Sequence, residues 1–383
     1  MPSLPRFIID PDIARATTLD TAFYTDPELF TLAKEKLFAP SWQFIGDDTL
    51  AAAAGDAFPL TLLEGYLDEP LVLVRDKDRE LRLLSNVCTH RGNIVVNEQC
   101  SLTQLRCRYH GRVFDLDGRF RSMPEFKEVA NFPSSADNLV SLPLERWGPW
   151  LFTSLAPGAS LASARTRSGG SVSGGGLSGG GFRDYWGDML QRLHWLPLGD
   201  YRPRPELSRD FTVKAHWALY CENYLEGFHI PYLHAGLNSV IDFGNYTTEL
   251  FRYSSLQLGI AKDDEEVFDL PASSPDHGKK VAAYYFFVFP NLMFNFYPWG
   301  LSVNIVKPVG LGETQVSFLT YIADESKYDK GAGSGLDIVE FEDEEVVEAV
   351  QRGVRSRFYT HGRYSVTREQ GTHHFHRLIA QSI

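Results

Sequence analysis

Two short stretches of sequence decide the fold of the first half of this chain: CTHRG at residues 88–92 and CRYHG at residues 107–111. Each stretch offers one cysteine thiolate and one histidine imidazole, and each ends on a glycine. Thiolates and imidazoles are the side chains that bind zinc and iron in proteins. A glycine lets backbone N–H groups approach a bound group closely, because it has no Cβ atom. The two stretches therefore predict paired loops that close a metal site with four ligands.

Two occupants of this metal site are considered. A structural zinc ion accepts two cysteines and two histidines, whereas a Rieske [2Fe–2S] cluster uses two cysteines on one iron and two histidines on the other. Zinc fingers usually pair Cys with Cys and His with His along the chain. Here one stretch supplies Cys88 and His90 and the other supplies Cys107 and His110. Because each loop can then give one ligand to each iron, the order of the ligands favours the cluster.

Short apolar runs around the metal-binding stretches predict a small all-β domain. The runs lie at residues 59–63, 71–74, 81–84 and 111–115. Turn-forming residues separate them, and Asp117-Gly118 predicts a hairpin turn. Before them, residues 26–38 have the apolar spacing of a helix. We expect residues 1–39 to form a helical segment that packs on the second domain.

The second half of the chain has a different pattern, which predicts an α+β domain. Strands are expected at residues 282–289, 292–296, 302–306 and 314–322, and helices at residues 218–229 and 338–357. Eight glycines and four serines fill residues 168–181, a composition typical of a flexible linker. We therefore expect one domain at 40–157, a linker or loop at 158–184, and a second domain at 185–383.

Composition excludes several classes of function. The 383 residues include 37 Lys and Arg against 49 Asp and Glu, a net charge of −12. This balance argues against a chain that binds nucleic acid or an anionic membrane. The four cysteines are too few for a disulfide scaffold, the first residues show no signal-peptide pattern, and no apolar run is long enough for a bilayer. We expect a cytoplasmic protein.

A second candidate metal site lies at residues 222–234. On an undisturbed helix, His229 and His234 would lie about 140° apart and could not share one metal ion. Pro231 lies between them and is expected to distort the helix so that the two rings approach each other. Two histidines and one carboxylate form the facial ligand set of non-haem Fe(II) oxygenases. Glu226, three residues before His229, is placed to hydrogen-bond to that ring.

The carboxylate ligand of this second site is left open by the sequence pattern. Seven carboxylates lie between residues 337 and 348, on the expected helix, so composition does not choose among them. Most of them are expected to form a solvated face of that helix.

The residues of both candidate sites resemble one family. The stretches at 88–92 and 107–111 are similar to the Rieske domain of ring-hydroxylating oxygenase α subunits. The run from Asn223 to His234, with the segments at 342–343 and 350–353, resembles the catalytic domain of the same enzymes. The likeness extends from about residue 20 to the last residue. One departure is Arg112, because the family usually has tryptophan there.

The resemblance implies a fold, two cofactors and a set of site residues. The fold is an all-β Rieske domain followed by a helix-grip (START/Bet v 1-like) catalytic domain with a large antiparallel sheet. Catalytic roles fall to Asn223 and Glu226. The implied ligands are Cys88, His90, Cys107 and His110 for a [2Fe–2S] cluster and His229, His234 and Asp343 for a mononuclear Fe(II).

The resemblance also implies partners. In the family, a carboxylate at the position of Glu226 links a cluster histidine of one subunit to the iron-binding histidine of the next. This implies that His110 of one chain faces Glu226 and His229 of its neighbour in a head-to-tail homotrimer. Electrons from NAD(P)H are expected to arrive through a separate reductase or ferredoxin, since the chain has no dinucleotide or flavin fingerprint.

Arginine is concentrated around the cluster stretches. Residues 86–121 contain six Arg and no Lys, against three acidic residues. One interpretation is a docking surface for an acidic electron donor, with Arg108 and Arg112 among its residues. The other is that these side chains form local salt bridges.

The expected activity is that of the oxygenase component: hydroxylation or oxidative demethylation of a small organic substrate with O₂. Nine aromatic residues between 284 and 299 suit a cavity wall, with half of them facing inward by alternation, but most of the nine are expected to be ordinary core residues. Such a wall suits an aromatic ring or a quaternary ammonium. Residues 289–293, 297–299 and 368–376 resemble the choline, carnitine and glycine-betaine branch of the family. Two alternatives are a Rieske electron carrier with a non-catalytic ligand-binding domain and a zinc-stabilised binding module.

Overall fold

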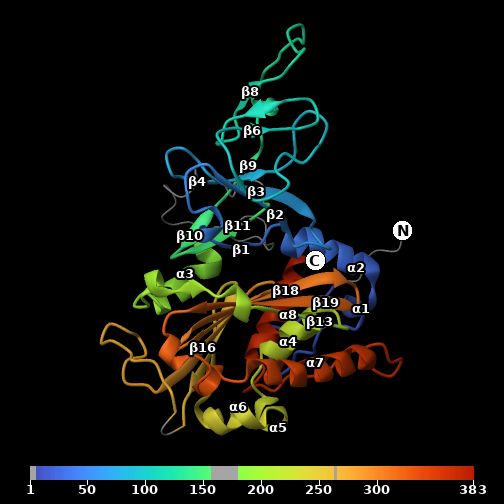
Figure 1. Ribbon diagram of the computed structural model, residues 1–383. Helices are drawn as coiled ribbons and strands as arrows, with labels where there is room; N and C mark the ends of the chain where they lie inside the picture. Colours follow the sequence, from blue (N-terminus) through green and yellow to red (C-terminus); the bar gives the residue numbers. More distant parts are fainter. Residues whose placement is uncertain (1–5, 157–179, 263–264) are drawn as a thin grey trace, which may run out of the picture. The chain divides into compact units, whose positions relative to one another are not determined.

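The structure is a computed structural model that describes residues 6–156, 180–262 and 265–383 (Figure 1). The described residues form two compact units, which we call the β unit (residues 42–156) and the α+β unit (residues 6–41 and 180–383). Most of the expected linker, residues 158–179, lies outside the described residues. In the part of the chain that the structure describes, no helix is long and apolar enough to cross a membrane.

The β unit consists of short antiparallel strands in three sheets. Its strands are β1 Gln43–Asp47, β2 Asp56–Leu62, β3 Glu69–Arg75, β4 Leu81–Ser85, β5 Cys100–Ser101, β6 Leu105–Arg106, β7 Val113–Phe114, β8 Phe120–Ser122, β9 Ser141–Leu142, β10 Glu145–Trp147 and β11 Trp150–Thr153. The strand orders are β5-β2-β3-β4-β9, β1-β11-β10 and β6-β7-β8. The prediction of an all-β domain is confirmed, because the apolar runs coincide with β2, β3, β4 and β7.

Each of the two stretches predicted to bind a metal in the β unit is the tip of a hairpin. Residues 107–111 connect β6 to β7, which pair through Leu105 and Phe114, and residues 88–92 are closed by a bridge between Val87 and Ile94. The hairpin turn predicted at residues 117–118 joins β7 to β8, and Gly118 adopts a φ of +87° there. A side chain at that position would approach the Cδ2 atom of Leu84 to 3.1 Å, so the turn requires glycine.

The α+β unit is built on one eight-stranded antiparallel sheet. The strands are β12 Arg202–Pro203, β13 Arg209–Val213, β14 Thr247–Leu250, β15 Ser254–Ile260, β16 Val281–Val288, β17 Leu292–Tyr297, β18 Gly300–Gly310 and β19 Glu313–Ile322. Their order is β12-β19-β18-β17-β16-β15-β14, with β13 also paired to β19. The four predicted strands coincide with β16 to β19, and the α+β class is confirmed.

Helices cover both faces of this sheet (Figure 1). They are α1 Ala22–Thr25, α2 Pro27–Ala33, the π-helix η1 Lys34–Phe38, α3 Phe182–Arg192, α4 Trp217–Tyr224, α5 Ile230–Leu233, α6 Ala235–Val240, α7 Leu336–Gly353 and α8 Gln370–Ser382. Trp186 of α3 packs against Phe294 on one face, with ring centroids 4.9 Å apart. On the other face, Phe375 of α8 packs against Phe287, and Tyr224 of α4 donates a hydrogen bond to Asn295. The candidate site lies on this second face.

Two helices differ in extent from the sequence prediction. The helix expected at residues 26–38 begins after Asp26, whose side chain accepts a hydrogen bond from the amide of Glu28, and changes to a π-helix at Lys34. Phe38 of that π-helix packs against Trp217, with centroids 4.8 Å apart, so this segment lies on the α+β unit. The helix expected at 338–357 spans Leu336–Gly353 instead.

Candidate metal centres and active site

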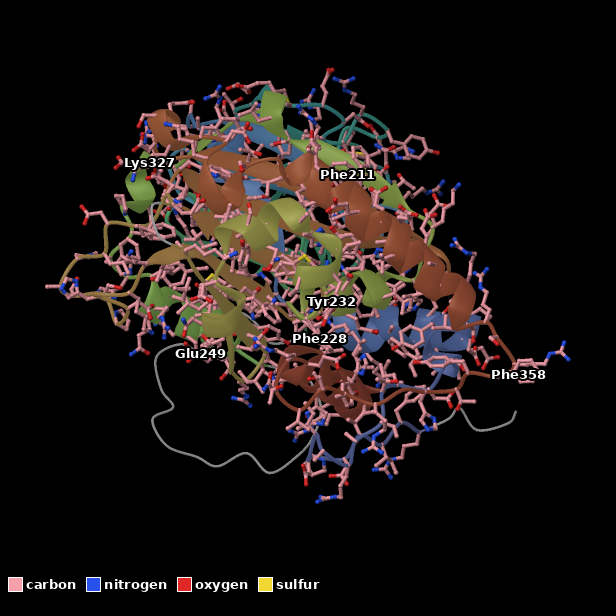
Figure 2. The ribbon with its side chains drawn as sticks, turned by 90° about the horizontal axis from the view of Figure 1, so that it is seen from below. Phe211, Phe228, Tyr232, Glu249, Lys327 and Phe358 are labelled. Carbon is pink, nitrogen blue, oxygen red and sulfur yellow. The ribbon has the colours of Figure 1, made fainter. Side chains whose placement is uncertain are left out.

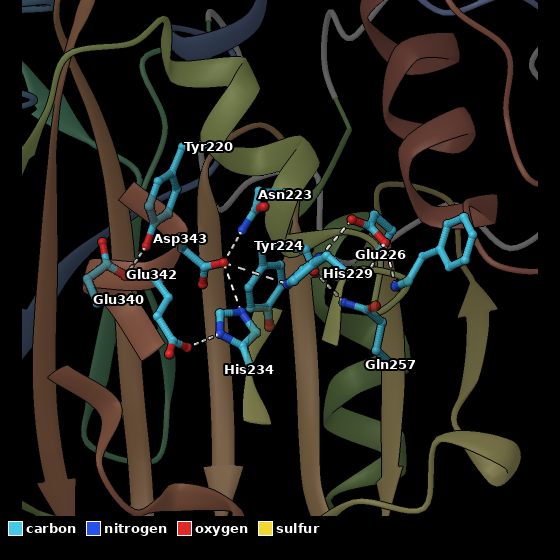
Figure 3. Close-up of polar contacts among 11 residues, drawn as sticks. Tyr220, Asn223, Tyr224, Glu226, His229, His234, Gln257, Glu340, Glu342 and Asp343 are labelled. Atoms are coloured by element: carbon cyan, nitrogen blue, oxygen red, sulfur yellow. Dashed lines mark hydrogen bonds and ion pairs between the residues drawn. The ribbon is translucent and has the colours of Figure 1, made fainter. Parts of the chain in front are cut away.

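Three donor atoms converge between the α4–α5 turn and α7. In the described part of the chain, His229, His234 and Asp343 are the group of three residues whose ligand atoms all lie within 4.8 Å of one another. The Nε2 atom of His234 lies 3.0 Å from Oδ1 of Asp343, and the Nε2 atom of His229 lies 3.6 Å from the same oxygen (Figure 3). Two imidazoles and one carboxylate fit a non-haem iron and leave coordination positions open.

The two histidines flank a one-turn helix. His229 precedes α5 and His234 follows it, and Pro231 lies in the first turn, where a missing N–H group removes no helical hydrogen bond. The helix expected at 218–229 is shorter than predicted, because α4 ends at Tyr224, and Pro231 lies in the first turn of a new helix instead of distorting the first one. The two rings approach to a centroid distance of 5.0 Å through a turn and a new helix.

Two carboxylates orient the two imidazole rings. The Nδ1 atom of His229 lies 2.7 Å from Oε1 of Glu226, and the Nδ1 atom of His234 lies 2.7 Å from Oε2 of Glu342. With Nδ1 engaged in both rings, Nε2 of each ring is directed at Asp343. A hydrogen bond of this kind fixes the ring and makes a metal-binding nitrogen more basic. The contact of Glu226 is the one expected from its spacing, whereas the contact of Glu342 was not foreseen.

The surroundings of the three donors favour positive charge. Asn223 donates a hydrogen bond of 2.7 Å from Nδ2 to Oδ1 of Asp343, which orients that carboxylate. Burial lowers the pKa of His234, but hydrogen bonds to Asp343 and Glu342 and the negative charge of both outweigh burial and raise it above its ordinary value. Side chains that stabilise the positive charge of a protonated His234 also suit a positively charged metal ion at the same place.

The carboxylates of α7 are arranged differently from the expectation. A largely solvated face was expected for the seven carboxylates at 337–348, but only Asp337 and Glu345 are exposed. Glu340, one turn before Asp343, is 3% exposed. Side chains three residues apart lie on the same face of a helix, so the inward direction of Asp343 extends to Glu340.

A cavity lies beside the three donors. Five tyrosines form much of its wall: Tyr220, Tyr224, Tyr246, Tyr285 and Tyr297. Neutral polar side chains also line it (Asn223, Gln257, Asn295, Ser302 and Asn304), as do apolar ones, among them Leu237, Phe318 and Val339. Of the nine aromatic residues at 284–299, Tyr285 and Tyr297 line the cavity; this is fewer than the half that alternation allows, and it agrees with the expectation that most of the nine are core residues. Alternate residues of β16 and β17 face α3 instead, as Phe294 does.

Three tyrosines of the wall were missed from the sequence. Tyr220 and Tyr224 lie four residues apart on α4, a spacing that places them on one helical face with Asn223 and that could have identified them. Tyr246 has no such signal. It approaches Gly227 so closely that a Cβ atom there would lie 2.6 Å from its ring, a contact between segments distant in the sequence.

The cluster ligands predicted in the β unit form two pairs. Cys88 and Cys107 are 3% and 2% exposed, and their thiols hydrogen-bond to each other. The rings of His90 and His110 lie with centroids 4.7 Å apart, and Nδ1 of His90 is buried without a partner among the described residues. A sulfur pair beside an imidazole pair fits a cluster that uses cysteines on one iron and histidines on the other.

Hydrogen bonds also surround the cluster cysteines. Burial raises the pKa of Cys107, but hydrogen bonds from the backbone at Tyr109 and His110 and from the side chain of Asn93 outweigh burial and hold this pKa below its ordinary value. The Nδ2 atom of Asn93 lies 3.5 Å from Sγ of Cys107. Gly92 and Gly111 both adopt the left-handed backbone conformation, with φ of +68° and +73°, so the two loops turn in the same way after their histidines. At Cys107 the surroundings therefore favour thiolate, the form that binds iron, whereas burial and the neighbouring Cys107 raise the pKa of Cys88.

Of the two interpretations of the arginine-rich stretch, Arg112 follows the second, because it forms a local salt bridge and is not part of an exposed docking surface. It is 2% exposed and donates from Nη2 to Oδ1 of Asp137 at 2.6 Å. Its guanidinium lies over the rings of Phe120 and Phe132, 4.9 and 5.5 Å from their centroids. The carbonyl of Asp137 also accepts a hydrogen bond from Thr89, between two cluster ligands, so Arg112 supports the cluster loop from inside.

Comparisons with known families match both units. The family model of the Rieske [2Fe-2S] domain matches residues 55–133, and that of the ring hydroxylating alpha subunit (catalytic domain) matches residues 198–383. A choline monooxygenase of Arabidopsis thaliana is 30% identical over 98% of this chain and 85% of its own length. The carnitine monooxygenase oxygenase subunit of Escherichia coli K12 is 29% identical over 96% of this chain and 94% of its own.

Solved structures share the fold. A quaternary ammonium Rieske monooxygenase superposes with a TM-score of 0.75 at 24% identity, over 99% of this chain and all of that one. Naphthalene 1,2-dioxygenase from Rhodococcus sp. gives 0.70 at 18% identity, over 95% and 94% of the two chains.

Proposed function

The chain belongs to the family of Rieske-type ring-hydroxylating oxygenase α subunits, and from this premise we propose that it oxidises a quaternary ammonium compound at His229, His234 and Asp343. It is the oxygenase component of a Rieske non-haem iron oxygenase, with a [2Fe–2S] cluster and a mononuclear iron as cofactors. When bound, the cluster supplies single electrons and the iron a place where O₂ is activated. A non-catalytic second domain is not favoured.

The proposed ligands follow from the two donor groups. Cys88 and Cys107 hold one iron of the cluster, and His90 and His110 hold the other. His229, His234 and Asp343 hold the mononuclear iron, while Glu226, Glu342 and Asn223 keep these ligands in orientation. The buried, unpartnered Nδ1 atom of His90 supports the first set, and the convergence of three donors within 4.8 Å supports the second.

The substrate proposal is carried by one observation: the cavity beside the three donors has five tyrosines in its wall and, among the described residues, no lysine or arginine. Aromatic faces attract a quaternary ammonium through cation–π contacts, with no need for N–H donors. The names of the similar choline and carnitine monooxygenases agree with this chemistry. One oxygen atom of O₂ would enter a C–H bond near the nitrogen, and the other would leave as water with two electrons and two protons.

The assembly proposal is a head-to-tail homotrimer in which His110 of one chain faces Glu226 of the next. Exposed aromatic side chains adjoin Glu226: Phe228 is 41% exposed and Tyr232 is 83% exposed, with ring centroids 6.2 Å apart. Figure 2 shows these two side chains beside each other on the face that carries α5. A second copy of the chain that covers this patch would remove apolar surface from water.

The test of function begins with metal analysis of the purified full-length chain. The proposal expects about three irons and two acid-labile sulfides per chain, whereas a zinc-stabilised module would contain zinc and no sulfide. Reductase-coupled O₂ consumption is then measured with quaternary ammonium compounds and with aromatic hydrocarbons, and products are identified by mass. Turnover of the aromatic compounds alone would overturn the substrate proposal.

The test of assembly uses Glu226→Gln. In a light-scattering measurement the wild-type chain is expected to have the mass of a trimer. The variant is expected to accept electrons from the reductase at the cluster as fast as the wild type, but to pass them to the substrate site at least tenfold more slowly. A monomeric wild type with full activity, or an unaltered rate in the variant, contradicts the proposal.

A further inference from the structure

Glu340 is a buried carboxyl in the cavity wall, and no cationic side chain of the described residues pairs with it. It lies on α7 and is 3% exposed. Its Oε2 atom accepts a hydrogen bond of 2.6 Å from the hydroxyl of Tyr220, and its Oε1 atom has no partner among the described residues (Figure 3). A buried polar atom without a hydrogen bond costs free energy, so a protein that keeps one needs a reason for it.

Another buried carboxylate of the same unit shows how this fold neutralises such a group. Asp276 is fully buried, and two cations contact it: Nε of Arg192 at 2.6 Å and Nζ of Lys279 at 2.8 Å. Tyr284 also donates to it, at 3.1 Å. Despite the opposing effect of burial, these partners hold the pKa of Asp276 below its ordinary value. Among the described residues, Glu340 has only the hydroxyl of Tyr220 as a hydrogen-bond partner.

The groups around Glu340 are acidic or neutral. Burial raises the pKa of Glu340 to about 8, and the neighbouring carboxylates Asp343, Glu344 and Asp337 act in the same direction. Tyr220, on α4, is the titratable group that faces it from another element. At neutral pH the side chain is therefore held as an acid that would ionise if a positive charge came within contact distance.

The position of Glu340 relates it to the chemistry of the site. It precedes Asp343 by three residues on α7, and such residues have Cβ atoms about 5–6 Å apart on one helical face. A cation in contact with Glu340 would therefore hold its adjacent carbon atoms next to the three metal-binding side chains.

We propose that Glu340 is the counter-charge for the cationic head of the substrate, and that the cavity consequently selects a quaternary ammonium that carries no carboxylate. This inference rests on the proposed function and deepens it. The described wall contains the carboxyl groups Glu226, Glu340 and Asp343 and no lysine or arginine that could pair with a substrate carboxylate. Its amides and hydroxyls suit a neutral hydroxyl group instead. A zwitterion would bring a carboxylate to a wall whose described residues offer it carboxyl groups and no lysine or arginine.

The test compares three probes of similar size on the iron-loaded full-length enzyme: choline, its neutral isostere 3,3-dimethylbutan-1-ol, and the zwitterion glycine betaine. Calorimetry is expected to show choline binding at least tenfold more tightly than either of the others. Glu340→Gln is expected to reduce choline affinity to that of the neutral isostere, whose own affinity changes less than twofold. Glu345→Gln is the matched control, since it removes an exposed charge from the same helix and is expected to change nothing.

A second measurement needs no variant. If Glu340 ionises against the ligand cation, choline binding releases up to about one proton, which titrations in two buffers of different ionisation enthalpy detect. The neutral isostere is expected to release none. Tighter binding of glycine betaine than of choline, or a choline preference that survives Glu340→Gln, would overturn the inference and leave the proposed function standing. If no quaternary ammonium binds, the proposed function itself fails.

Discussion

In each unit of the molecule a buried ionisable side chain lies close to the proposed metal ligands, but the one in the β unit has a partner of opposite charge and the one in the α+β unit has none among the described residues. In the β unit, the guanidinium of Arg112 pairs with Asp137 and lies over phenylalanine rings. In the α+β unit, Glu340 accepts a hydrogen bond from the hydroxyl of Tyr220, and burial and the charges of nearby carboxylates raise its pKa. A buried charge with a partner of opposite charge inside the same unit stabilises the folded state. A buried acid that is left without a cation is suited to a partner that arrives from outside.

The largest expected effect tests whether the two regions serve separate metal centres. Asp343→Asn weakens a metal ligand, because an amide oxygen carries no charge. Turnover is expected to fall by roughly 10³-fold or more, and iron to drop from about three to about two per chain with the cluster absorbance intact. Glu342→Gln, which changes only the partner of His234, is the milder control, with an expected loss of about 10- to 100-fold in iron affinity. Retention of all the iron by Asp343→Asn would show that the carboxylate ligand lies elsewhere.

Removal of Arg112 tests the claim that its charge serves the fold. Arg112→Met retains apolar volume over Phe120 but leaves Asp137 without its cation, which is expected to destabilise the β unit by about 3 kcal/mol. The measurement is denaturant unfolding followed by the visible absorbance of the cluster. Arg121→Met is the comparison, because Arg121 is exposed and its pair with Asp115 is expected to contribute less than about 1 kcal/mol. If both variants lost the same stability, the buried pair of Arg112 would contribute no more than an exposed pair, and the interpretation that Arg112 stabilises the β unit would be wrong.

Removal of the Glu340 carboxyl is expected to increase the stability of the fold, whereas removal of Arg112 is expected to decrease it. Its pKa is raised to about 8 in the folded chain, so between pH 4.5 and 8 the folded state holds a proton that the unfolded chain has lost. Wild-type stability therefore decreases as pH rises through this window. The Glu340→Gln variant has no carboxyl at this position, so its stability lacks this decrease. The variant is expected to gain about 2 kcal/mol relative to the wild type between pH 5.5 and 7.5, measured by chemical denaturation. Asp276→Asn, which removes a carboxylate paired with cations, is expected to lower stability at pH 7.5. A destabilised Glu340→Gln would assign this residue a role in the fold.

The difference between the two regions also explains what the sequence could predict. The cluster loops were predicted because their ligands and glycines lie within two five-residue stretches. His229 and His234 are equally local, but Asp343 is more than a hundred residues away among seven carboxylates, and only the family resemblance selected it. The three donors do converge in the structure.

The residues that the sequence did not reveal depend on long-range packing. Arg112 belongs to an arginine-rich stretch, and its burial is set by Phe132 and Asp137, which lie 20 and 25 residues later in the sequence. Glu340 belonged to an acidic helix whose inward face is fixed by α4 and the sheet. Composition describes the charge of such segments, but only packing decides which of their charges lose contact with water.

The smallest expected effect concerns the arginines that do remain on the surface of the β unit. Arg91, Arg106 and Arg108 are exposed, and no ion pair joins them to another described residue, whereas Arg119 pairs with Asp117 at 3.3 Å. If unpaired arginines attract an acidic electron donor, Arg108→Glu is expected to slow cluster reduction two- to fivefold at low salt. The same reversal at Arg119 is expected to do less.

Added salt distinguishes this docking effect from damage to the fold. Attraction between exposed charges is screened within about 10 Å at 0.1 M ionic strength. The difference between Arg108→Glu and the wild type is therefore expected to disappear above about 0.5 M salt, in stopped-flow measurements with the reductase. A rate that matches the wild type at every ionic strength would place the docking surface elsewhere. A defect that persists at high salt would mean that Arg108, like Arg112, supports the cluster loop and does not recruit a partner.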